Sequence, residues 1–215
     1  MGILITVVVL AVFGLLALLI AAGVRNHRRV MGLMEEQPRW AAAHGFSYHA
    51  GPVILTDASI QPPFSASAVN AGHFEGSFNG HRARAFVHTF EGHKDGTFRT
   101  VRYAVAAVPH NRPGLFLDIA EKGLPAQLAD RLTGGQPLGD PHFDERFAIR
   151  TNDVEYARWL LRPDVVAWIK QDQRFATMPV RIDRGWLMTW YEDHLDPKLL
   201  PAQLTFLTEI LARTR

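Results

Sequence analysis

The sequence contains no cysteine among its 215 residues. This absence excludes disulfide bonds, catalysis by a cysteine thiolate and zinc sites with cysteine ligands. It leaves the redox compartment open, because a chain without cysteine is stable under oxidising and reducing conditions alike. Net charge is also nearly absent, at +2, although 19 arginines greatly outnumber four lysines. Such a small charge does not indicate a nucleic-acid partner.

Motifs that mark catalytic and cofactor sites are missing as well. The sequence has no HExxH zinc motif, no GxSxG nucleophile elbow, and neither a GxGxxG nor a GxxxxGK[ST] phosphate-binding loop. We therefore assign no catalytic residue, no cofactor-binding residue and no metal ligand from motifs, and we expect no cofactor.

Charge is absent from residues 3–24, which contain one hydroxyl, that of Thr6. Twenty-two helical residues span about 33 Å, against roughly 30 Å of bilayer hydrocarbon, so the segment predicts a transmembrane helix. A cleaved signal peptide is the alternative, since Ala21, Ala22 and Gly23 offer small residues for cleavage. The apolar run is too long for a usual signal peptide, however, and no Lys or Arg precedes it.

Arginines follow the apolar segment at once, at Arg25, Arg28 and Arg29. Positive residues stay on the cytoplasmic side, so the sequence predicts a single-pass protein of the cell membrane with most of the chain in the cytoplasm; export is the alternative. The three arginines also suit contact with anionic lipid headgroups. We expect residues 1–29 to form the anchor and residues 30–215 a single soluble domain, with the bilayer as partner through residues 3–24.

Two hairpins dominate the expected soluble domain. Asn79-Gly80 is a strong two-residue turn that places Glu75 opposite Arg84 as a cross-strand ion pair. A second hairpin turns at residues 183–185, and residues 195–215 have the leucine spacing of a closing helix. This order predicts an α+β fold, in which hairpins build an antiparallel sheet and short helices and a C-terminal helix pack on one face.

Other local signals fill in the domain. We expect a short helical connection over residues 30–44, in which Trp40 and three alanines follow Pro38 and Gly45 supplies the stop. A first strand over residues 46–55 and a short helix over residues 124–135 should follow. Residues 142–151 alternate as a strand would, and Asn152 or Asp153 follows as the cap of the next helix.

The stretch FDERFAIRTNDVEYARWLLRP, followed by GWLMTW and a C-terminal helix, resembles uncharacterised single-span membrane proteins of actinobacteria. The resemblance implies a membrane-anchored domain of unknown function, and it supplies no catalytic residues. It depends on the following positions: Phe143, Phe147, Asp153, Ala157, Arg158, Leu160, Leu161 and Pro163.

Two functions remain as hypotheses. The first is a membrane-tethered, non-enzymatic scaffold or interaction domain, whose protein partner is unknown. The second is a membrane-associated, hydrolase-like enzyme with a site on the hairpin face that carries His73, Glu75 and His88, which could also hold zinc.

A basic strip is a further expectation. Arg82 and Arg84 project from one face of the first hairpin, and Arg102 projects from the next strand if Val101 points inward. If these strands are neighbours, the three arginines would meet an anionic membrane surface.

Overall fold

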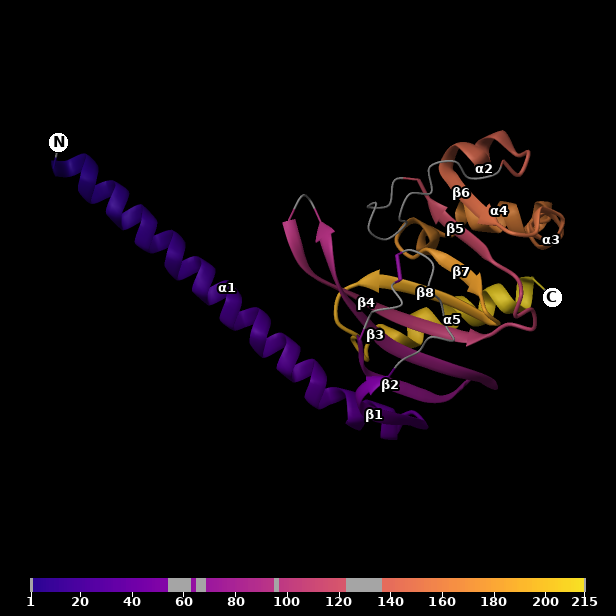
Figure 1. Ribbon diagram of the computed structural model, residues 1–215, viewed down its shortest axis with the longest axis horizontal. Helices are drawn as coiled ribbons and strands as arrows, with labels where there is room; N and C mark the ends of the chain where they lie inside the picture. Colours follow the sequence, from indigo (N-terminus) through magenta and orange to yellow (C-terminus); the bar gives the residue numbers. More distant parts are fainter. Residues whose placement is uncertain (1, 54–62, 65–68, 95–96, 123–136, 215) are drawn as a thin grey trace.

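The computed structural model describes the backbone of residues 2–53, 63–64, 69–94, 97–122 and 137–214; side chains are described for these residues except 2–9, 11, 52–53, 69–71 and 93–94. Eight antiparallel strands form one sheet in the order β1-β2-β3-β4-β8-β7-β5-β6 (Figure 1). The strands are β1 (Phe46–Val53), β2 (Val69–Phe78), β3 (His81–Lys94), β4 (Thr97–Pro109), β5 (Leu117–Glu121), β6 (Phe147–Thr151), β7 (Val180–Asp183) and β8 (Trp186–Glu192). The helices are α1 (Gly2–Ala43), α2 (Pro141–Arg146), α3 (Val154–Leu160), α4 (Pro163–Gln171), the short 3-10 helix η1 (Gln173–Ala176) and α5 (Leu200–Arg213).

The helices pack on one face of the sheet, as the sequence predicts. The central strands present small side chains to this face, among them Ala85, Ala104 and Ala106, all fully buried. Small residues leave room for the closing helix to lie close to the sheet. The predicted leucine stripe of α5 is confirmed, because these four residues are buried in the same core: Leu200, Leu204, Leu207 and Leu211.

Both predicted hairpins are confirmed. Asn79 and Gly80 have φ values of 49° and 78° and join β2 to β3. This register pairs Glu75 with Arg84, and their side chains form an ion pair of 2.6 Å. The second hairpin turns at Arg184-Gly185, again with positive φ values of 50° and 81°, and joins β7 to β8.

The N-terminal helix differs from expectation. We predicted a transmembrane helix over residues 3–24 and a separate short helical connection over residues 30–44, but α1 runs without a break from Gly2 to Ala43, with Pro38 inside it. A proline in a helix removes one hydrogen bond. Packing compensates for this lost hydrogen bond, because Leu33, Gln37 and Ala41 recur every four residues and are buried against the domain.

Polar contacts also attach the C-terminal end of α1 to the domain. The Gln37 side chain donates to the backbone carbonyl of Leu195 at 3.0 Å, and Arg29 forms an ion pair of 2.7 Å with Asp193. The helix stops where predicted, because Gly45 adopts a φ of 73° that residues with a side chain rarely take. The last part of α1, from Leu33 to Ala41, is therefore packed into the folded domain.

The strand predicted over residues 142–151 begins late. Its first part is the helix α2, because Asp140 accepts a hydrogen bond from the Phe143 amide at 3.0 Å and Pro141 occupies the first helical position. The chain then extends into β6 from Phe147. Local capping chemistry thus overrides the alternating pattern. The helix predicted over residues 124–135 lies outside the described residues.

The predicted cap of α3 is Asp153, which accepts from the Tyr156 amide at 2.9 Å. Asn152 takes another role. Its side chain accepts from the Phe116 amide at 2.8 Å and donates to the Gly114 carbonyl at 2.8 Å. Asn152 therefore fastens the β4–β5 loop to the start of α3.

A buried arginine lies on the other face of the sheet. Arg181 of β7 is 1% exposed, and its Nη2 donates to Oδ2 of Asp118 on β5 at 2.7 Å. Arg150 of β6 reaches the same carboxylate oxygen at 3.0 Å. The Arg181 guanidinium also lies 5.3 Å from the ring centroid of Trp190 and 5.4 Å from that of Phe64. One carboxylate thus connects three strands.

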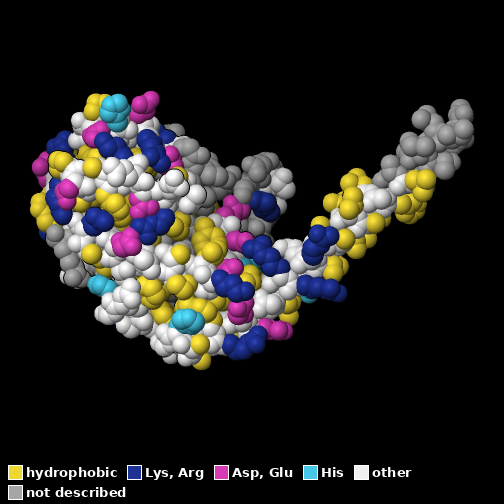
Figure 2. Space-filling model, turned by 180° about the vertical axis from the view of Figure 1, so that it is seen from behind, with side chains coloured by type: hydrophobic (Ala, Val, Ile, Leu, Met, Phe, Trp, Pro, Cys, Tyr) yellow, Lys and Arg dark blue, Asp and Glu magenta, His cyan; other side chains and the backbone are white. Residues whose placement is uncertain are grey.

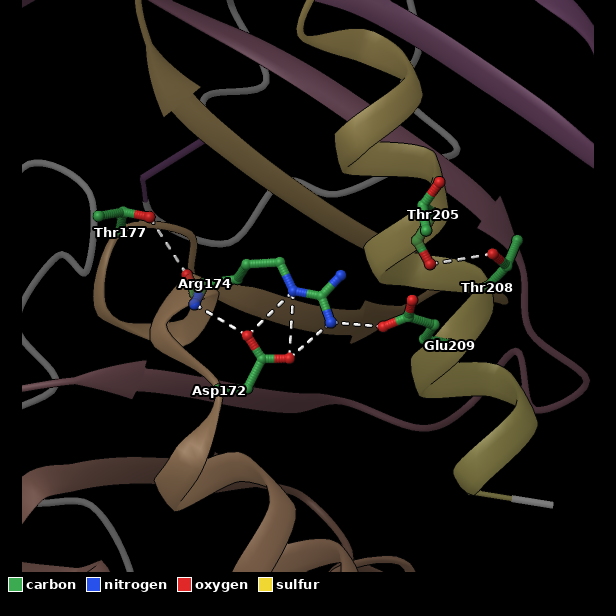
Figure 3. A network of polar contacts seen from close by, with 6 residues as sticks. All are labelled: Asp172, Arg174, Thr177, Thr205, Thr208 and Glu209. Atoms are coloured by element: carbon green, nitrogen blue, oxygen red, sulfur yellow. Dashed lines mark hydrogen bonds and ion pairs between the residues drawn. The ribbon is translucent and has the colours of Figure 1, made fainter.

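A second arginine connects η1 to the closing helix (Figure 3). Arg174 donates to Asp172, the residue that caps η1, through Nη2 at 2.6 Å, and it also reaches Glu209 of α5. The bond from Arg174 is the main reason that the pKa of Asp172 lies below its ordinary value. This network holds the segment before β7 against α5.

Replacing Asp153 with alanine should lower the free energy of unfolding by about 0.5–2 kcal/mol, because the first turn of α3 loses its cap. Urea titration followed by tryptophan fluorescence measures this change. Glu155→Ala is the matched control, since it removes only an exposed ion pair with Arg158. Equal stability of the two variants would contradict the capping role.

Asp118→Asn should destabilise the protein by about 3–5 kcal/mol, because it leaves the Arg181 guanidinium buried without its carboxylate. Glu36→Gln breaks only the exposed pair with Lys198, 3.6 Å apart, and should leave the unfolding curve nearly unchanged. A loss below about 1 kcal/mol for Asp118→Asn would show that the buried pair is not important for stability.

Candidate binding groove at the end of the sheet

A groove opens at one end of the sheet, where four segments distant in sequence meet. A pocket of about 320 Å³ lies between the β2–β3 turn, the β4–β5 loop, Tyr156 of α3 and the end of α5. It shares Asn111 and Arg112 with a wider hollow of about 650 Å³ that continues along residues 152–155. In Figure 1, the β2–β3 turn and the C-terminus lie on the side of the domain away from the N-terminal half of α1.

Backbone contacts hold the β4–β5 loop, which forms one wall of the groove. The His110 amide donates to the Gly185 carbonyl at 2.7 Å, which ties the β4–β5 loop to the β7–β8 turn. Gly185 has a φ of 81°, which residues with a side chain rarely adopt, so glycine suits this turn. With Asn152 at the other end, the loop is held at two points.

The groove is lined by cations. Arg112 lies over the ring of Tyr156, with its guanidinium carbon 4.0 Å from the ring centroid. Arg82 follows the β2–β3 turn, is exposed, and lines the same pocket beside His81. Within the described part of the chain, neither arginine forms an ion pair with a carboxylate.

His110 lies on the pocket wall. Its Nδ1 is buried and has no hydrogen-bond partner in the structure. Burial lowers the pKa of His110, and the nearby charge of Arg112 lowers it further. The imidazole is therefore neutral at pH 7, with one ring nitrogen able to donate and the other able to accept a hydrogen bond.

The predicted histidine face is present on the sheet but is not an open site. His73 stacks on His49 with ring centroids 4.6 Å apart, and Glu75 is held by Arg84. His88 is only 4% exposed and lies edge-on to Phe64, with ring centroids 5.0 Å apart. Across the described ranges, no three His, Asp or Glu side chains are grouped as a metal ion would need.

The predicted basic strip does not form. Strand pairing aligns Arg102 with Thr89 and Arg84 with Ala107, so Arg102 lies on the opposite face of the sheet from Arg82 and Arg84. The expectation was wrong because Val101 and Tyr103 are buried in the aromatic cluster on the same face as Arg84. Residues of β4 are buried on both faces of the sheet. The alternation of side chains along the strand therefore does not reveal on which face Arg102 lies.

The other predicted arginines lie on α1. Arg25, Arg28 and Arg29 are exposed, and Arg29 forms the ion pair with Asp193 described above. Within the described residues, no helix combines the length and the hydropathy that a membrane crossing requires.

Sequence reasoning missed the groove. The stretch PHNRPG, residues 109–114, has the composition of a turn, and its histidine and arginine are its only functional signal. The pairing of β3 with β4, in which Arg84 lies opposite Ala107, brings Arg82 next to that loop, and the route of the chain to α3 brings Tyr156 there. No local pattern places the loop beside Tyr156.

Acid should destabilise the protein partly through His88. Burial lowers the pKa of His88 to about 4. The unfolded chain therefore binds this proton first as the pH falls. The contribution of the neutral, buried His88 to the free energy of unfolding is intact above about pH 6.5 and is lost toward pH 4. This loss is at most about 3 kcal/mol. His88→Gln should flatten the dependence of unfolding free energy on pH between 7 and 4.5. His27→Gln, on the exposed surface of α1, should keep the wild-type slope. A His88→Gln slope equal to that of the wild type would contradict this assignment.

Comparisons with known proteins support the fold. No protein-family model matches this sequence, and no curated protein matches it. The structure is similar to the crystal structure of the mycobacterial trehalose monomycolate transport factor A, TtfA, with a TM-score of 0.57, 13% sequence identity, and coverage of 86% of this chain and 97% of that chain. Mycobacteria are actinobacteria, so this neighbour comes from the group that the sequence resembles. At 13% identity, the likeness shows a shared fold.

Proposed function

We propose that this protein is a membrane-tethered, non-enzymatic interaction module. In this proposal, residues 3–24 of α1 cross the bilayer once, residues 1–29 form the anchor with its basic flank, and residues 30–215 form a cytoplasmic domain. The domain presents its groove on the side away from the membrane. The N-terminal half of α1 carries the proposal.

That half of α1 exposes apolar side chains on every side. At 100° per residue, positions 10 to 24 complete four turns, and no direction around the helix is polar. A helix that is apolar all round needs an apolar environment, and lipid supplies one without breaking any backbone hydrogen bond. The exposed residues are Leu10, Val12, Phe13, Leu15, Leu16, Leu18, Leu19, Ile20 and Val24.

Charge supports the orientation. Figure 2 shows Lys and Arg side chains gathered on α1 between its apolar part and the domain, where Arg25, Arg28 and Arg29 lie. Arginines beside an apolar helix favour the cytoplasmic side and interact with anionic headgroups. Because the last part of α1 is packed into the domain, the helix would hold the domain at a fixed orientation to the bilayer.

The structural neighbour supports an accessory role. TtfA is described as a transport factor for trehalose monomycolate. A protein with the same fold is accordingly proposed to assist a process at the membrane through binding. The enzyme alternative on the face of His73, Glu75 and His88 has less support, since His88 is buried and Glu75 is engaged by Arg84.

The absence of cysteine gives a direct test of topology. Single cysteines at Gly2 and Arg158 place one thiol before the apolar helix and one on the exposed surface of α3. A membrane-impermeant maleimide should label Gly2→Cys in intact cells, and Arg158→Cys only after the membrane is opened. The wild-type chain, which cannot react, is the control.

Extraction of the membrane fraction is a second test of the proposed membrane anchor. The full-length chain should remain in the membrane fraction after an alkaline carbonate wash, and a chain without residues 2–24 should be soluble. Labelling of Arg158→Cys in intact cells would indicate export. Release of the full-length chain by carbonate would contradict a spanning helix.

A further inference from the structure

We propose that the groove binds the phosphate group of a small soluble molecule, either inorganic phosphate or a phosphomonoester, through Arg82 and Arg112, beside His110. The inference goes beyond the tether, because it assigns a ligand to the domain. The position of the groove relative to the bilayer rests on the proposed function, whereas the binding of phosphate does not.

The first argument is charge. Most arginines of the domain pair with carboxylates, as Arg84 does with Glu75 and Arg174 with Asp172. Arg82 and Arg112 line one small pocket and, among described residues, have no carboxylate partner. Guanidinium groups match phosphate oxygens with two parallel hydrogen bonds, so two of them around one pocket suit a compact dianion.

The second argument is preorganisation. The guanidinium carbon of Arg112 lies 4.0 Å from the centroid of the Tyr156 ring, and this contact restricts the positions that the long side chain can take. A ligand at this site binds an arginine that is already oriented, and it therefore loses less affinity to the ordering of a long side chain.

The third argument is the neighbouring histidine. His110 lines the same pocket, and Arg112 is close enough for its charge to lower the pKa of His110. An anion bound by Arg82 and Arg112 would therefore also lie near His110 and would offset this effect of the Arg112 charge.

Shape and flanking charge favour a small ligand over an acidic peptide. The cationic pocket has a volume of about 320 Å³, and its continuation carries Asp153 and Glu155. An extended acidic chain that followed the groove would meet these carboxylates, whereas a compact phosphate stays among the arginines. The β2–β3 turn and the end of α5, which border the groove, lie away from the N-terminal half of α1 (Figure 1), so a soluble phosphate reaches the groove more readily than a lipid headgroup does.

The test is calorimetric titration of the full chain in nanodiscs of neutral lipid at low salt, with inorganic phosphate, glycerol 3-phosphate and, as the uncharged comparison, glycerol. Both phosphates should bind and glycerol should not. Arg82→Gln and Arg112→Gln should each weaken binding about tenfold, the loss of one charge-assisted hydrogen-bonding group. Arg158→Gln is the matched control, because it removes a nearby exposed charge that does not line the pocket, and it should bind like the wild type.

Nuclear magnetic resonance of the His110 ring provides a second readout that does not depend on the stability of the variants. Saturation with phosphate should raise the pKa of His110, because an anion now stabilises the imidazolium, and the other histidines should change little. Unchanged titration of His110, or equal weakening by Arg158→Gln and Arg82→Gln, would overturn the site.

Vesicles separate the two sources of phosphate. Binding to phosphatidylglycerol vesicles by the chain without residues 2–24, together with no binding of either soluble phosphate, would replace the proposed ligand with a lipid headgroup. The cysteine-labelling result tests the tether independently, so failure of the site and failure of the tether give different outcomes.

Discussion

The carboxylate of Asp118 is the constraint on which the groove end of the molecule depends. Strands β5, β6 and β7 are short, with four or five residues each. Asp118 on the central strand binds Arg181 on one neighbour and Arg150 on the other. These three strands support the β4–β5 loop and the start of α3, so a single buried charge network positions the groove.

The network also explains why the second face of the sheet is closed. Arg181 lies among aromatic rings, including Trp190 and Phe64, that cover its guanidinium. Aromatic faces favour a cation electrostatically and exclude water at the same time, which strengthens the pairing with Asp118. The histidine at position 88 is buried in the same environment and is held neutral by it. A face that reads as polar from the sequence is thus largely interior.

The distribution of charge divides the molecule into functional regions. Several arginines of the sheet, among them Arg84, Arg150 and Arg181, pair with carboxylates, as do Arg174 of η1 and Arg29 of α1. Among the described cations that form no ion pair, Arg25 and Arg28 lie on α1 next to its apolar half, and Arg82 and Arg112 lie in the groove. A tether at one end and an anion-binding groove at the other would allow the domain to respond to a soluble ligand while it stays at the membrane.

The sequence by itself determined the local structure. Asn79-Gly80 specified the first hairpin and the pairing of Glu75 with Arg84, and Asp153 specified the start of α3, because each depends on residues only a few positions apart. The leucine stripe of α5 and the alternation of strands and turns were sufficient for the α+β class.

Only the tertiary structure decided that β8 pairs with β4 and that Arg102 lies on the face of the sheet opposite to that of Arg84. Both faces of the sheet are buried, so the alternation of side chains along a strand does not distinguish them. It also decided that α1 is continuous through Pro38, because packing against the domain outweighs the lost hydrogen bond. The groove depends on tertiary structure most of all: Arg82, His110, Arg112 and Tyr156 come from three segments, and strand order, which no local pattern encodes, brings them together.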